Sequence, residues 1–200
     1  MEIDFYTGNR HKVETANKWL NRYGITLRQR SFEFKEIQAV DPLDVAMDKA
    51  EQIINNTRMA PDNLPINSFM IEDTAFSIKA LNGFPGALFK YVFPFLGYAK
   101  ILAMMKDESD RSASFNGVIV YYDNISNKLN HFSGIVEGSL AMSPSKDMKE
   151  GALANALFIP KGWDKTLAEA DDKDWDRFFK EIEPNDHYAK FGRWFQASQA

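Results

Sequence analysis

The sequence predicts an α/β fold with a mixed β-sheet flanked by helices. Short apolar runs typical of strands alternate with segments of helical periodicity along all 200 residues. The chain is 44% hydrophobic and 14% aromatic, which is enough to build a sizeable core. No linker clearly divides the sequence, so we expect a single domain over residues 1–200.

The N-terminal part begins with an apolar run at 3–6 that we expect to form a strand. A turn at Thr7-Gly8-Asn9 leads into a helix predicted over 10–23, which Gly24 ends. A second strand is expected over 25–27. Asp41 and Pro42 are typical of a helix N-cap and first helical position, and the helix they start has its apolar stripe at Ala46, Ala50, Ile53 and Ile54.

The central apolar run, 69–71, predicts a strand that ends at Glu72 and Asp73, with 78–81 as its hairpin partner. The remaining expected elements are a helix over 87–105 interrupted near Pro94, paired strands over 112–122 and 129–136, a short strand over 156–159, and closing helices over 174–182 and 188–197.

Composition excludes several classes of function. Without cysteine the chain has no disulfide, zinc thiolate site or thiol nucleophile, which fits a reducing cytoplasm. The net charge of −4 argues against binding to a nucleic-acid backbone. The sequence has neither a signal-peptide pattern nor 18 consecutive apolar residues, so we expect a cytoplasmic protein that does not cross a membrane.

Glu72 and Asp73 are the first candidates for chemistry. Adjacent carboxylates repel each other unless a cation or a shared proton compensates. Hard divalent ions such as Mg²⁺ prefer these oxygen ligands. The pair therefore predicts either a magnesium site with a base that orients water, or two solvated acids at a hairpin tip.

The Thr7-Gly8-Asn9 turn is the second candidate. A glycine turn before a helix exposes backbone N–H groups and the positive end of the helix dipole, which favour a phosphate. Lys12 adds a full positive charge one turn into the helix. Taken alone, the pattern favours a plain strand-to-helix turn, because it contains neither G-x-x-x-x-G-K-[ST] nor G-x-G-x-x-G.

Three further residues are each open to two interpretations. Glu36 is a solvent-facing acid or a ligand. Lys90 follows a loop rich in glycine and proline, and is a second phosphate contact or a surface lysine. His187 is a surface or capping residue, or a catalytic one.

The order of these motifs resembles the inosine triphosphate pyrophosphatase (HAM1-like nucleoside-triphosphate pyrophosphatase) family. The resemblance covers nearly the whole chain. It is carried, in sequence order, by Thr7-Gly8-Asn9 with Lys12, Glu36-x-Gln38, Glu72-Asp73-Thr74, Ala80-Leu81-Asn82-Gly83-x-Pro85-Gly86, Lys90-Tyr91, Phe132-Ser133-Gly134, Phe158-x-Pro160 and His187.

This resemblance implies an elongated mixed sheet, two lobes around a central cleft and a homodimer. It also implies Mg²⁺-dependent hydrolysis of a nucleoside triphosphate to monophosphate and pyrophosphate, with Mn²⁺ as the alternative metal. Glu36 and Asp73 would bind the metal, and Asp73, with Glu72 and Lys12, would act in catalysis. Substrate binding would fall to Thr7, Gly8, Asn9, Lys12, Lys90, Asn155, His187 and Tyr188.

The segments that would bind the base depart from the family pattern. The aromatic stretch of the family is replaced by Ala152-Leu153-Ala154-Asn155-Ala156, and Tyr188 stands where the family has an arginine. We therefore expect a non-standard purine or other modified nucleotide as substrate. The alternatives are a pyrimidine preference, as in Maf-like pyrophosphatases, and a nucleotide-binding relative without catalysis.

Overall fold

The computed structural model describes residues 1–59, 65–145 and 153–199. The chain folds into two compact units, and each is built from segments that are distant in sequence. The first unit comprises Met1–Asp73, Gly117–Gly134 and Asp186–Ala200, and the second comprises Thr74–Asn116 and Ile135–Asn185. Three long strands, β3, β5 and β6, each contribute residues to both units.

A seven-stranded mixed sheet has the order β2-β1-β3-β5-β6-β7, with β4 paired to β3. β1 is parallel to both β2 and β3, whereas β3–β4 and β6–β7 are antiparallel. The strands are β1 (Glu2–Tyr6), β2 (Thr26–Arg30), β3 (Phe69–Ile78), β4 (Pro85–Gly86), β5 (Ser112–Asp123), β6 (Lys128–Leu140) and β7 (Phe158–Pro160).

Five α-helices accompany the sheet among the residues that the structure describes. They are α1 (Arg10–Leu20), α2 (Pro42–Met59), α3 (Phe89–Met104), α4 (Asp172–Ile182) and α5 (His187–Gln199). The structure thus confirms the predicted mixed α/β fold, and most strands and helices lie where the sequence predicts them.

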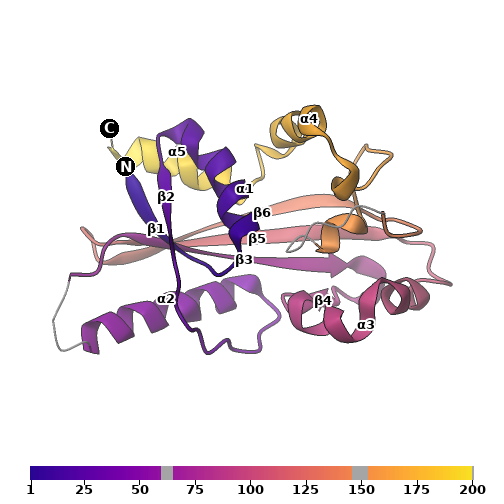
Figure 1. Ribbon diagram of the computed structural model, residues 1–200, viewed down its shortest axis with the longest axis horizontal. Coiled ribbons are helices and arrows are strands. Elements are labelled where there is room, and N and C mark those ends of the chain that lie inside the picture. Colours follow the sequence, from indigo (N-terminus) through magenta and orange to yellow (C-terminus); the bar gives the residue numbers. More distant parts are fainter. Residues whose placement is uncertain (60–64, 146–152, 200) are drawn as a thin grey trace. The chain divides into compact units, whose positions relative to one another are not determined.

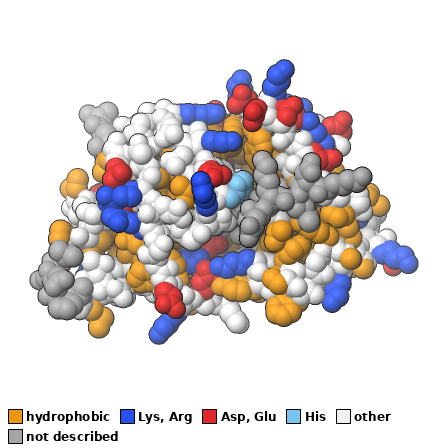
Figure 2. Space-filling model, viewed as in Figure 1, with side chains coloured by type: hydrophobic (Ala, Val, Ile, Leu, Met, Phe, Trp, Pro, Cys, Tyr) orange, Lys and Arg blue, Asp and Glu red, His pale blue; other side chains and the backbone are white. Residues whose placement is uncertain are grey.

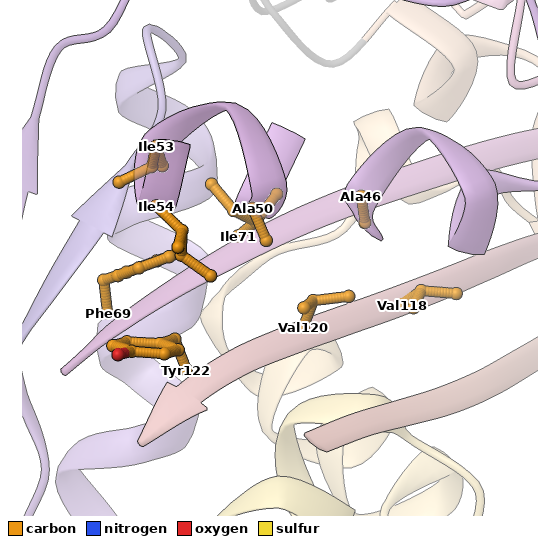
Figure 3. Close-up of a cluster of buried hydrophobic side chains, with 9 residues drawn as sticks. All are labelled: Ala46, Ala50, Ile53, Ile54, Phe69, Ile71, Val118, Val120 and Tyr122. Carbon is orange, nitrogen blue, oxygen red and sulfur yellow. The ribbon is translucent and has the colours of Figure 1, made fainter. Parts of the chain in front are cut away.

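The first unit has three layers (Figure 1). Helices α1 and α5 lie side by side on one side of its strands, and α2 lies on the other. The apolar stripe of α2 packs on β3 and β5, as Figure 3 shows, and the predicted stripe residues face the sheet. This core is formed by Ala46, Ala50, Ile53, Ile54, Phe69, Ile71, Val118, Val120 and Tyr122.

The second unit has an aromatic core on its part of the sheet. Phe76 on β3 contacts Phe115 on β5 and Phe158 on β7, with ring centroids 5.1 and 6.2 Å away. Phe89, at the start of α3, lies 5.5 Å from Phe76. These rings join the helix that carries Lys90 to the strand that follows Asp73.

The central strand differs from its prediction. β3 continues through Glu72 and Asp73 to Ile78, so the two acids lie in the middle of a strand and not at its tip. The predicted hairpin partner, 78–81, is wrong: Lys79–Leu81 form a 3-10 helix, and the antiparallel partner is Pro85–Gly86. The sequence pattern fails here because Glu72 is a buried strand residue despite its charge.

Helix α3 is interrupted as expected, but at a different residue. Pro94 lies within the helix, whereas the non-helical backbone is at Gly97, with φ 59° and ψ −176°. That conformation is accessible to glycine at little cost. No helix among the described residues is both long and apolar enough to cross a membrane.

Candidate active site

The first unit brings Glu36 and Asp73 together around one lysine. Lys49 Nζ, on α2, lies 2.8 Å from Glu36 Oε1 and 2.7 Å from Asp73 Oδ2. All three side chains are largely buried, with 10–16% of each exposed. Glu36 is therefore not a solvent-facing acid. Its carboxylate and that of Asp73, which the family resemblance assigns to a metal, both form an ion pair with Lys49.

Lys49 is not among the site residues predicted from sequence, although a signal for it is present. The residue stands within the apolar stripe of α2, four residues after Val45 and four before Ile53, and both of these are buried. A lysine in such a stripe is buried on the core side of its helix, where it requires a counter-charge. Two carboxylates supply this counter-charge: Glu36 on a loop and Asp73 on β3.

Glu72 faces two other cationic groups. Lys12 Nζ lies 2.8 Å from Glu72 Oε2, and His187 Nε2 lies 3.7 Å from Glu72 Oε1. Lys12 Nζ also donates to the Glu72 backbone carbonyl at 3.3 Å. The Glu72 side chain is only 3% exposed. Adjacent strand residues point to opposite faces, and the ion pair of Glu72 is with Lys12 whereas that of Asp73 is with Lys49.

The electrostatic balance of this cluster keeps its groups charged. Burial raises the pKa of Glu72, but Lys12 and His187 outweigh it and hold that pKa far below its ordinary range. Burial lowers the pKa of Lys12, whereas Glu72, Asp73 and Glu36 raise it, and the net shift is upward. Glu72 is thus a fixed anion that holds cations rather than a group that exchanges protons near neutral pH.

His187 is also held in its charged form. Burial opposes the charge, but Asp186 and Glu72 together raise its pKa to about 9. Nδ1 lies 3.5 Å from Asp186 Oδ2. Asp186 Oδ1 meanwhile accepts hydrogen bonds from the Tyr188 and Ala189 amides at the start of α5. Tyr188, whose substrate role stays a prediction, is 4% exposed.

The Thr7-Gly8-Asn9 turn is built largely by its own side chains. Thr7 Oγ1 accepts from the Asn9 amide at 3.1 Å, and Asn9 caps α1 by accepting from the amides of His11 and Lys12. Two of the amides at the start of α1 therefore donate to the Asn9 side chain. The helix dipole and the Lys12 ammonium group are the features of this turn that can attract an anion.

The remaining predicted residues belong to the second unit. Lys90 is exposed on α3, with its Nζ 4.8 Å from the centroid of the Tyr91 ring. Asn155 lies half-buried in the 3-10 helix Leu153–Ala156. Ala152, the first residue of the altered base segment, lies outside the described residues.

The second unit also has a pocket of about 700 Å³. Its lining includes hydroxyl groups on β5 and β6 and residues after β7, among them Ser112, Ser114, Ser139, Lys161 and Trp163. No predicted site residue lines it in the described part of the chain. The pocket is thus a feature separate from the predicted site.

A divalent metal fits the Glu36–Asp73 pair. Two carboxylates already converge on one cation, and Mg²⁺ uses one or two protein carboxylates together with substrate phosphate oxygens. Among the described residues, no group of three or more His, Cys, Asp or Glu side chains forms a metal site by itself. The donor set therefore suits a metal that a phosphate ligand helps to bind.

Comparisons with family models and with known proteins agree on one family. The Ham1 family model matches residues 3–178. The chain is 33% identical over 169 residues to a dITP/XTP pyrophosphatase of Thermococcus kodakarensis, covering 84% of this chain and 85% of the relative. It is 35% identical over 170 residues to a dITP/XTP pyrophosphatase of Pyrococcus horikoshii, covering 84% of each.

Solved structures share the fold at lower identity. A nucleoside-triphosphatase/dITP/XTP pyrophosphatase of Mycobacterium abscessus superposes with a TM-score of 0.69 at 20% identity, covering 92% of this chain and 96% of that one. The Ham1 protein of Staphylococcus aureus gives a TM-score of 0.67 at 20% identity, covering 100% and 98%. The family resemblance inferred from the motif order is confirmed, and the chain belongs to the Ham1 family.

Proposed function

We propose that this protein is a divalent-metal-dependent nucleoside-triphosphate pyrophosphatase. The observation that carries the proposal is the convergence of Glu36, Asp73 and Lys49, beside the ion pair between Lys12 and Glu72 in the same unit. This arrangement offers anionic oxygen to a metal and cationic nitrogen to phosphates. The names of the two archaeal relatives, dITP/XTP pyrophosphatases, support the same activity.

The reaction would convert one triphosphate and one water into a monophosphate and pyrophosphate. Water oxygen forms a bond to the α-phosphorus, and the bond to the bridging oxygen breaks with its electron pair on pyrophosphate. Asp73 would orient the water and take its proton. Mg²⁺ or Mn²⁺, when bound, neutralises charge on the phosphate oxygens.

The chain's lysines would complete the phosphate site. Lys12 has partners at Glu72, yet 26% of its side chain is exposed, so it can present part of its ammonium group to an anion. Lys49 would move its contacts from the carboxylates toward phosphate as the metal binds Glu36 and Asp73. By resemblance, Thr7, Gly8, Asn9 and Lys90 would contribute further phosphate contacts.

The substrate class is a nucleotide with a non-standard purine base. The relatives named for dITP and XTP support it. Asn155, His187 and Tyr188 are the residues assigned to the base by resemblance. Because Asn155 and Tyr188 depart from the family pattern, the order of preference among such bases is expected to differ from that of typical members.

A pyrophosphate-release screen tests the proposal. Purified protein would be assayed with Mg²⁺, Mn²⁺ or EDTA against standard nucleotides, dITP, XTP and the pyrimidine triphosphates. We expect release with dITP or XTP, abolished by EDTA. Thermal stabilisation by nucleotides without any product would instead identify a non-catalytic binding protein, and preference for pyrimidine triphosphates would favour a Maf-like specificity.

We further propose a cytoplasmic homodimer that binds neither nucleic acid nor membranes. The homodimer rests on the family resemblance. The absence of cysteine supports the cytoplasm, and the net charge of −4 argues against binding to nucleic acid. On the face shown in Figure 2, Lys and Arg side chains stand beside acidic ones rather than in one continuous positive surface. Light scattering after size-exclusion chromatography would measure the oligomeric state.

A further inference from the structure

Gly117, on β5 in the first unit, lies directly against the His187 ring. A Cβ atom at position 117 would stand 2.3 Å from Cε1 and 2.5 Å from Nδ1 of that ring. Heavy atoms do not approach so closely without displacement. The backbone at Gly117 does not have a positive φ, so glycine is needed here for space and not for conformation.

Glycine inside a strand is unfavourable unless something approaches its backbone closely. Here the approaching group is an imidazole with little freedom to move. His187 is 12% exposed and lies between the carboxylates of Asp186 and Glu72, 3.5 and 3.7 Å from its two ring nitrogens. A ring pushed away from position 117 would therefore lose at least one of these contacts.

The contact between His187 and Glu72 bears on Lys12. The Glu72 carboxylate faces His187 through Oε1 and Lys12 through Oε2. His187 Nε2 has no hydrogen-bond partner among the described residues, so its interaction with Glu72 is one of charge. Moving the ring changes the balance of forces on the Glu72 carboxylate, and with it the position of the Lys12 ammonium group.

We propose that Gly117 is a positioning residue, which admits the His187 ring beside Glu72 so that Glu72 holds Lys12 toward the triphosphate. This inference rests on the proposed function, because it assigns Lys12 a phosphate to bind. Gly117 itself touches no reacting atom. It acts through the chain of contacts from Gly117 to His187, Glu72 and Lys12, all within the first unit.

A double-mutant cycle between Gly117→Ala and His187→Asn tests this role. Gly117→Ala should raise the KM for the triphosphate about tenfold, as the loss of one well-placed charged contact does. His187→Asn should have a similar effect. In the His187→Asn background the ring is gone, so Gly117→Ala should change KM by less than about twofold.

Gly192→Ala is the matched control. A Cβ at position 192, on α5, would stand 2.2 Å from the Tyr23 ring, so this substitution creates a comparable collision in the same unit. It should lower stability but leave KM unchanged, because a packing defect reduces the amount of folded enzyme rather than its affinity. A folded Gly117→Ala protein with wild-type KM would overturn the proposal. So would an equal rise in KM in both His187 backgrounds.

Two outcomes need a separate measurement. If Gly117→Ala does not fold, the double variant decides: it should fold and match the KM of His187→Asn, and its failure to fold would refute the proposal. If the wild type releases no pyrophosphate, the proposed function fails. Urea-unfolding midpoints of the four proteins would then test the packing relation alone, with Gly117→Ala expected to destabilise only where His187 is present.

Discussion

The ammonium group of Lys49 lies 2.7 Å from the Asp73 carboxylate and bridges it to Glu36. Two carboxylates this close to one nitrogen would repel each other strongly without it. The lysine thus serves as the counter-ion of both carboxylates, and a divalent metal would compete with it for the same oxygens.

Replacement of Lys49 by Met should make stability dependent on metal. The variant leaves Glu36 and Asp73 facing each other, so without metal the free energy of unfolding should fall by about 1–3 kcal/mol. Mg²⁺ should raise the melting temperature of Lys49→Met more than that of the wild type. Differential scanning fluorimetry with EDTA and with Mg²⁺ measures both effects. If Mg²⁺ raises the melting temperature of the two proteins equally, Lys49 does not compete with the metal.

Asp73→Asn should abolish most turnover in a folded protein. The amide removes a metal ligand and the proposed base, and we expect kcat to fall by about a hundredfold or more. Glu36 still pairs with Lys49, so the melting temperature should change little. Asp123→Asn, at the last residue of β5, is the control and should retain wild-type kcat. Wild-type turnover in Asp73→Asn would show that the acid has no catalytic role.

Asn9 has a capping role that can be separated from any role with phosphate. Asn9→Ala removes the acceptor for the His11 and Lys12 amides and should cost about 1 kcal/mol in urea unfolding. Asn9→Asp keeps the cap but adds a negative charge near the proposed phosphates, so it should retain stability while raising KM. If Asn9→Asp leaves KM unchanged, no phosphate lies near this turn.

The charged state of His187 predicts a pH-dependent stability. Its pKa rises from 6.5 in the unfolded chain to about 9 in the folded one, owing to Asp186 and Glu72. A raised pKa stabilises the folded state fully below about pH 6.5, and this contribution is lost as pH rises through about 9. The loss should be about 3 kcal/mol.

Urea unfolding at pH 6 and pH 9.5 measures this loss, with His187→Asn as the comparison. The variant should lose less stability than the wild type over the same interval. Asp186, Glu72 and Tyr188 lie around the ring, and Lys12 acts on it through Glu72. The pKa of Glu72 is lowered and those of Lys12 and Tyr188 are raised, so none of these three changes charge across this range. If the stability of the two proteins falls equally with pH, a group other than His187 titrates.

Much of the fold follows from local sequence. The apolar stripe of α2 is apparent in the sequence as periodic apolar residues, and it packs against β3 and β5. The course of β3 is not visible, because Glu72 interrupts the apolar pattern with a charge. Burial of that carboxylate depends on Lys12, which lies 60 residues away in sequence. A local pattern contains no information about such a partner.

The candidate site divides in the same way. The order of motifs identifies the family and the residue types that take part. Lys49 escapes notice because a lysine within an apolar stripe has no obvious role until Glu36 and Asp73 are known to lie beside it. Gly117 likewise has no motif, and only its distance from the His187 ring explains it.

Apolar periodicity and motif order are properties of the chain, so the fold class, the family and the acids and cations available for chemistry can be predicted from sequence. Which cation each acid faces depends on the three-dimensional fold. Ion pairs between buried groups depend on distances of a few ångströms between residues far apart along the chain, and those distances are set by packing of the whole unit.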